Sequence, residues 1–120
     1  MAKILIVDDA PDTVDLVKVI LKKEGYNLVE ADNGQEAIDQ WRKENPDLIL
    51  LDIMMPDKSG WDVYQEIRKE DKDVKISFLS VIEVSEDRKK TLIDEGLSDY
   101  IIKPFTSDEL VKRVNAILKK

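Results

Sequence analysis

Residues 3–32 of the chain read KILIVDDAPDTVDLVKVILKKEGYNLVEAD. They begin with a run rich in β-branched apolar residues, Lys3–Val7, as expected for a strand that is covered on both faces. Apolar residues then recur at helical spacing, with Pro11 near the first turn and Gly25 as the expected C-terminal cap. A second strand is expected over residues 26–31. A strand, a helix and a strand in this order predict one parallel βαβ unit.

The same alternation continues to the end of the chain. The remaining expected strands cover residues 47–52, 74–79 and 100–102. The remaining expected helices run through Ala37 and Trp41, through Trp61 and Ile67, over residues 85–95, and onward from a capping-box pair, Thr106 and Glu109. Five strands in strict alternation with five helices predict an α/β domain, a parallel sheet with helices on both faces.

The composition limits the size and the chemistry of the protein. The 120 residues are enough for one domain, which we expect to span residues 1–120. The chain has no Cys and no His, so thiol nucleophiles, thiolate metal sites and histidine acid–base catalysis are excluded. Any catalytic or metal chemistry must use carboxylates, hydroxyls and amines.

The charge and the hydropathy limit where the protein works. The formal net charge is -7, which makes direct binding to nucleic acid unfavourable because every phosphate repels the chain. The longest apolar runs, residues 4–7 and 48–51, are far shorter than the ~18 residues of a membrane span. The N-terminus is too polar for a signal peptide. We therefore expect a cytoplasmic domain that binds neither membrane nor nucleic acid.

A parallel sheet brings the carboxyl ends of all its strands to one edge, where ligands bind in folds of this class. The residues at those strand ends therefore indicate the function. They are Asp8-Asp9, Ala31-Asp32, Asp52, Ser80 and Lys103-Pro104.

Three of these residues indicate a metal site. Adjacent acids such as Asp8 and Asp9 could simply favour the N-terminus of the following helix. Asp52, however, ends an otherwise apolar strand, and if the first and third strands are neighbours three carboxylates converge. Like charges that close raise one another's pKa, and a hard divalent cation relieves the repulsion. Asp8, Asp9 and Asp52 therefore predict a Mg²⁺ site.

Lys103 and Ser80 extend this site. A lysine at a strand end is usually only solvated, and a serine there usually caps a helix. Opposite three carboxylates, Lys103 could also bind an anion that joins the metal, and Ser80 could donate a hydrogen bond to the same point. A carboxylate nucleophile with Mg²⁺, an ammonium group and a hydroxyl is typical of phosphoryl transfer to a carboxylate.

From end to end the chain resembles the receiver domain of a two-component response regulator. The loop over residues 54–60 resembles the segment that follows the family's phosphorylated aspartate, with Gly60 in the expected place. The other matching positions are the acidic pair Asp8 and Asp9, the phosphoacceptor Asp52, the switch hydroxyl Ser80, the aromatic switch Tyr100, and Lys103-Pro104. The resemblance implies a flavodoxin-like, doubly wound sheet of order 2-1-3-4-5 with five flanking helices.

The resemblance also implies roles for these residues. Asp9, Asp52 and the backbone carbonyl of Met54 would contact Mg²⁺, with Asp8 nearby or binding through water. Asp52 would accept a phosphoryl group, whose oxygens Ser80 and Lys103 would bind. Such a domain is a signalling phosphoacceptor that assists its own phosphorylation and dephosphorylation, not a metabolic enzyme.

The resemblance implies partners as well. A histidine kinase or a phosphotransfer protein would be the donor, and the output face, formed by helix four, strand five and helix five, would act on a downstream domain or protein. Tyr100 would turn inward on activation, and the Lys103–Pro104 peptide bond would be cis. The chain is expected to be either a stand-alone receiver or a piece of a larger regulator.

Two positions depart from the commonest pattern of the family. Ser80 stands where Thr is more frequent, and Val81 stands where a small residue is usual. Val81 should crowd the approach to the phosphoryl group, and with Met54 and Ile82 also apolar nothing obvious orients a hydrolytic water. We therefore expect slow loss of the phosphoryl group.

Three other functions share features with this sequence. A flavodoxin-like FMN binder would share the fold, but the acidic residues 8–12 would repel the phosphate of FMN. A phosphohydrolase with an aspartyl intermediate usually needs a second acid two residues after the nucleophile, where this chain has Met54. A degenerate receiver that acts only as a phosphorylation-independent interaction module is the most serious alternative, although the key site residues are present.

Overall fold

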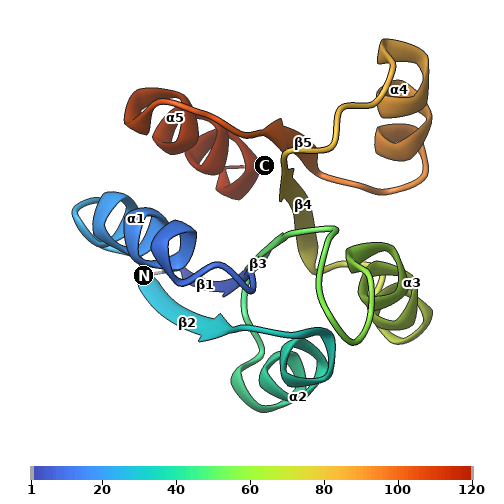
Figure 1. Cartoon of the computed structure of the whole chain (residues 1–120), viewed down its shortest axis with the longest axis horizontal. Helices are drawn as coiled ribbons and strands as arrows, with labels where there is room; N and C mark the ends of the chain where they lie inside the picture. The colour runs from blue at the N-terminus through green and yellow to red at the C-terminus, as the bar shows by residue number, and fades with distance from the viewer. Residues whose placement is uncertain (1, 120) are drawn as a thin grey trace.

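The computed structural model describes residues 2–119 and places five parallel strands in one sheet. Their order across the sheet is β2-β1-β3-β4-β5, which confirms the predicted order (Figure 1). The strands are β1 (Lys3–Val7), β2 (Asn27–Ala31), β3 (Leu48–Leu51), β4 (Lys75–Ser80) and β5 (Asp99–Ile102). The apolar runs predict the centre of the sheet correctly, because every residue of β3 is buried, as are the last four of β1.

Helices cover both faces of the sheet (Figure 1). They are α1 (Pro11–Lys22), α2 (Gly34–Glu44), α3 (Gly60–Glu70), α4 (Glu86–Asp94) and α5 (Ser107–Leu118). One apolar core joins α1 and α5 to the sheet through residues such as Val17 and Val114. The other joins α2, α3 and α4 to the opposite face, where Ile38, Ile67 and Leu92 are buried. The doubly wound α/β prediction is confirmed.

Most predicted element ends lie within one residue of the observed ones, and the predicted capping box of α5 is formed by Thr106 and Glu109. The end of α1 differs from the prediction. The helix stops at Lys22 with Lys23 as its C-cap, so Gly25 is not the cap. Gly25 has a φ of 90° and makes the turn into β2, a conformation that favours glycine because it has no Cβ.

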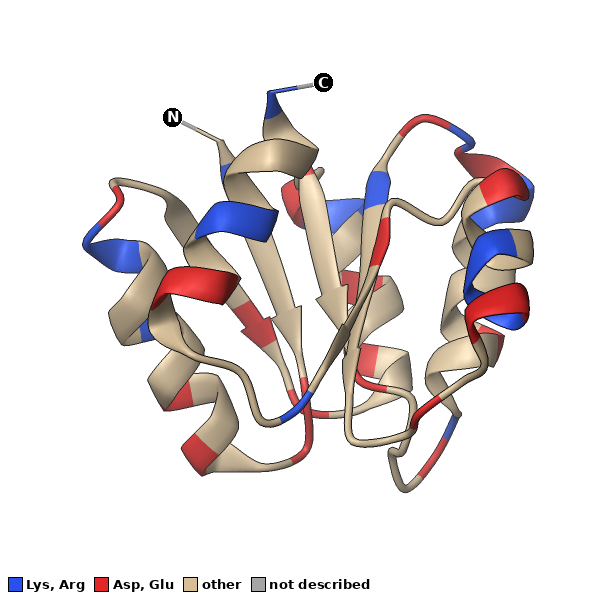
Figure 2. Cartoon of the chain, turned by 90° about the horizontal axis from the view of Figure 1, so that it is seen from above, with Lys and Arg blue, Asp and Glu red and all other residues tan. Residues whose placement is uncertain are grey.

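Acidic segments gather where the strand arrows end, with a basic segment among them (Figure 2). This is the carboxyl edge of the sheet, where the sequence predicts the site. Within residues 2–119, no helix combines the length and the apolar character needed to cross a membrane.

Candidate functional site

The strand register brings the predicted carboxylates together. Val7 of β1 lies opposite Leu51 of β3, so the next residues, Asp8 and Asp52, leave the sheet side by side. The pairing continues past the strands, because the Asp52 amide donates to the Val7 carbonyl at 2.9 Å and the Asp8 amide donates to the Ala31 carbonyl at 3.1 Å. Backbone hydrogen bonds alone therefore fix the positions of Asp8 and Asp52.

The acidic cluster consists of Asp8, Asp9 and Asp52. One carboxylate oxygen from each residue lies within 4.8 Å of the others. Asp8 and Asp52 are buried, at 2% and 7% exposure, whereas Asp9 is exposed. Carboxylate oxygens are the ligands that Mg²⁺ prefers, and the exposed side leaves room for the waters that it keeps. The donor set therefore fits this ion.

Lys103 reaches this cluster from the end of β5. Its Nζ lies 2.6 Å from Oδ2 of Asp8 and 3.8 Å from Oδ2 of Asp52. The ammonium group is therefore bound mainly by Asp8, a detail that the sequence did not indicate. The peptide bond between Lys103 and Pro104 is cis, as predicted.

The surroundings of Asp52 disfavour the ionised form of its carboxyl group. Burial raises the pKa of its carboxyl group; the Lys103 ammonium opposes this rise, and the carboxylate of Asp8 adds to it. Hydrogen bonds from the Ser80 hydroxyl and the Met54 amide lower the same pKa. The net shift is upward, so the ionised site is under electrostatic strain that an added cation would relieve.

The two predicted switch residues are both fully buried. Ser80 ends β4 beside Asp52, and its hydroxyl oxygen accepts a hydrogen bond from the Ile82 amide at 3.3 Å. Tyr100 lies fully inside the protein, and its hydroxyl group donates a hydrogen bond to the Ile82 carbonyl at 2.5 Å. Both residues thus bind the segment that follows β4.

The loop between β3 and α3 is held tightly against Asp52. The Gly60 amide donates to the Ile53 carbonyl at 2.7 Å, which closes the base of the loop. A Cβ at position 60 would lie 2.3 Å from the backbone oxygen of Asp52, so only glycine fits there. Met54 begins the loop with an exposed side chain, and the role of its carbonyl stays a prediction.

Sequence reasoning missed one residue of this loop. The Asp57 carboxylate accepts hydrogen bonds from the backbone amides of Gly34 and Gln35, at 2.8 Å and 2.9 Å. These amides belong to the first turn of α2, more than twenty positions earlier in the chain. No local motif could indicate this contact, because it depends on how the loop lies on the helix.

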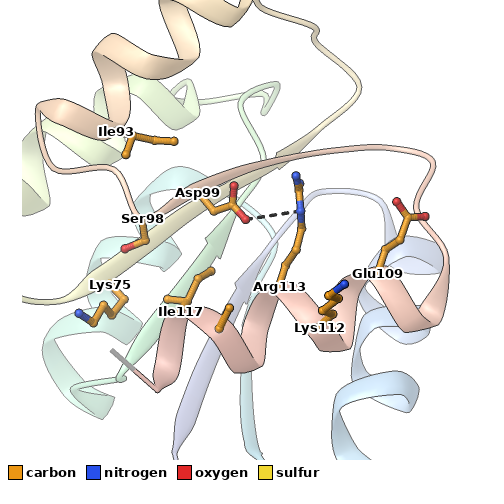
Figure 3. A pocket seen from close by; sticks show the side chains of 9 residues that line it. Lys75, Ile93, Ser98, Asp99, Glu109, Lys112, Arg113 and Ile117 are labelled. Atoms are coloured by element: carbon orange, nitrogen blue, oxygen red, sulfur yellow. Dashed lines mark ion pairs between the residues drawn. The ribbon is translucent and has the colours of Figure 1, made fainter.

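A groove of about 620 Å³ lies away from the acidic edge, between β5 and the helices α4 and α5 (Figure 3). Arg113 of α5 crosses it, with Nε 3.6 Å from Oδ2 of Asp99 and Nη1 3.2 Å from the Tyr100 carbonyl. Arg113 therefore attaches α5 directly to β5, the strand that carries Tyr100. These elements are the ones that the resemblance names as the output face.

Comparisons with known proteins agree on one family. A family model described as the response regulator receiver domain matches residues 4–115. The transcriptional regulatory protein TrcR of Mycobacterium tuberculosis is 38% identical over 118 residues, which cover 98% of this chain and 46% of TrcR. The chain spans about half the length of the curated relatives it matches.

Solved structures give the same result. The response regulator TrrA of Thermotoga maritima, in complex with Mg²⁺-BeF, is 40% identical with a TM-score of 0.85, and the match covers 98% of this chain and 100% of that one. The BeF3-activated N-terminal receiver domain of RstA from Klebsiella pneumoniae is 30% identical with a TM-score of 0.87, and the match covers 98% and 99%.

Proposed function

Because the chain belongs to the receiver domains of two-component response regulators, we propose that it accepts a phosphoryl group on Asp52 in a reaction that requires Mg²⁺. The observation that carries the proposal is the convergence of three carboxylates and one ammonium group at the carboxyl edge of the sheet. Bound Mg²⁺ would supply positive charge to the phosphoryl oxygens during transfer. The Mg²⁺ in the TrrA structure supports this choice of ion.

Each residue of the site has a proposed part in the transfer. A carboxylate oxygen of Asp52 forms the new bond to phosphorus as the bond from phosphorus to the donor's imidazole nitrogen breaks. Lys103 and Ser80 bind the phosphoryl oxygens. Asp9, Asp52 and the backbone carbonyl of Met54 would hold the metal, with Asp8 nearby or binding through water. Catalysis here is mostly positioning and charge neutralisation.

The partners follow from the same chemistry. These 120 residues contain no His, so the donor histidine must lie outside them, in a histidine kinase or a phosphotransfer protein of the cytoplasm. Tyr100 and Arg113 connect the site to the face formed by α4, β5 and α5, which would act on a downstream domain or protein. DNA binding, where it occurs, would belong to such a separate output domain.

The proposal is tested by incubating the protein with acetyl phosphate and measuring its intact mass. We expect the mass of one phosphoryl group to be added with Mg²⁺ present and almost none after chelation with EDTA. Borohydride reduces an aspartyl phosphate to homoserine with release of phosphate, so proteolysis after reduction should find homoserine at position 52. An unmodified protein would favour the phosphorylation-independent interaction module. An adduct that forms equally well without metal would contradict the requirement for Mg²⁺.

The lifetime of the adduct is a separate prediction. Val81 directly follows Ser80 and is 61% exposed, and Met54 lies two residues after Asp52 and is 59% exposed. These apolar side chains would border the approach of water to the phosphoryl group. Val81→Ala and Met54→Asn should shorten the lifetime several-fold, because the first opens the approach of water and the second can hydrogen-bond to it. Loss of phosphoryl mass with time after removal of the donor is the measurement. Val19→Ala, at an exposed valine of α1, is the control, and equal lifetimes in all variants would contradict the prediction.

A further inference from the structure

The loop that follows Asp52 is held by hydrogen bonds at its base and at its tip. At its base, the Gly60 amide is bound to the Ile53 carbonyl. At its tip, both carboxylate oxygens of Asp57 accept backbone amides from the first turn of α2. The first amides of a helix have no partner within the helix, so a carboxylate from elsewhere in the chain is well placed to bind them.

The charge of Asp57 strengthens this second attachment. The amides of Gly34 and Gln35 lower the pKa of its carboxyl group to about 2, so the group is ionised throughout the neutral range. Hydrogen bonds to an ionised acceptor are roughly twice as strong as those between neutral groups. The positive end of the α2 helix dipole adds to the same attraction.

Close packing shows that the helix lies directly on the loop. A Cβ at Gly34 would be 2.6 Å from Cβ of Lys58 and 3.2 Å from Cγ2 of Val63. The first residue of α2 is therefore in contact with the loop residue next to Asp57. The helix has its own local cap as well, because Oδ1 of Asn33 accepts the Glu36 amide at 2.9 Å.

We infer that Asp57 is a positioning residue, which holds the loop carrying Met54 against α2 and thereby sets the affinity of the acidic site for Mg²⁺. The inference rests on the proposed function, because the Met54 carbonyl belongs to the proposed metal site. With the tip of the loop released, α2 would no longer help to fix that carbonyl. Its direction would then depend on the loop base at Gly60, on the bond from the Met54 amide to Oδ1 of Asp52 at 3.4 Å, and on the packing of Met55 against the core. Losing a residue that orients a metal ligand typically weakens metal affinity by about 10- to 100-fold.

The test compares Asp57→Ala with Asn33→Ala by calorimetric titration of the purified 120-residue protein with MgCl2. Both variants remove an acceptor from the same helix N-terminus, but only the first releases the loop. We expect the Kd for Mg²⁺ to rise at least about 10-fold in Asp57→Ala and to stay at the parent value in Asn33→Ala. Asp57→Asn, which keeps one acceptor oxygen, should show a smaller rise and serves if the alanine variant does not fold.

Three other results of the Mg²⁺ titration would contradict the inference. Equal Kd values in the parent, Asp57→Ala and Asp57→Asn would overturn the inference and leave the proposed function intact. Equal weakening in Asn33→Ala would also overturn it, because the effect would then come from the stability of α2 alone. A parent protein that binds no Mg²⁺ would overturn the metal site of the proposed function and, with it, this inference.

Discussion

The Asp52→Asn variant is expected to gain no phosphoryl group from acetyl phosphate and to unfold at a higher urea concentration than the parent protein. Acceptance is lost because a neutral amide cannot replace the carboxylate nucleophile. Stability rises because burial, reinforced by the charge of Asp8, raises the pKa of Asp52 despite the opposing charge of Lys103. Ionisation therefore costs free energy in the folded protein, and the amide removes that cost.

The pH dependence of this stability difference has a definite sign. A carboxyl group whose pKa is raised by folding binds its proton more tightly in the folded state than in the unfolded state. The penalty on the parent protein is therefore complete above the raised pKa of Asp52. It declines as the pH falls through that value, and it vanishes below the unfolded pKa of about 3.9. Urea titrations at neutral and at acidic pH should show the two proteins converging in acid.

Asp73→Asn is the matched control for this experiment. It removes the same unit of negative charge from an exposed position beside the start of β4, at the opposite edge of the sheet. We expect this variant to accept the phosphoryl group like the parent protein and to change little in stability. A full adduct on Asp52→Asn would show that the acceptor is another residue, and equal stability of Asp52→Asn and the parent would contradict the electrostatic strain.

The fold could be predicted because its signals are local. Apolar runs such as residues 48–51, helical spacing and capping pairs such as Thr106 and Glu109 each specify a short element, and their strict alternation implies a parallel sheet. The neighbours of each strand are not a local property. The meeting of Asp8 with Asp52 therefore depended on a strand order that came from the family resemblance.

The sequence predicts which residues gather at the carboxyl edge of the sheet, but it does not give the contacts that they make. Lys103 was expected opposite the carboxylates, yet its preference for Asp8 over Asp52 depends on side-chain positions that no spacing encodes. Full burial of Tyr100 depends on packing against Phe78, whose ring centroid is 5.8 Å away. The attachment of Asp57 to α2 joins two segments that only the folded chain brings together.

Lys103→Met is expected to lower the free energy of unfolding at neutral pH by about 3 kcal/mol. Methionine keeps most of the side-chain volume but leaves the buried carboxylates of Asp8 and Asp52 without their nearest cation. Removing one partner of a buried ion pair is costly because the remaining charge is neither solvated nor compensated. Urea unfolding of the variant and the parent without metal measures the loss.

Lys18→Met is the matched control, because Lys18 pairs with Glu30 at the surface, where both side chains are about half exposed. Such a pair contributes only ~0–1 kcal/mol.

Added Mg²⁺ should change the stability of Lys103→Met more than that of Lys18→Met. The Lys103 ammonium and the metal compete for the same carboxylates, so Lys103→Met should bind Mg²⁺ more tightly than the parent and recover part of its lost stability. At ten times the Kd, the metal contributes ~1.4 kcal/mol. Equal losses in the two variants, or no recovery with Mg²⁺, would mean that Lys103 does not balance the charge of this site.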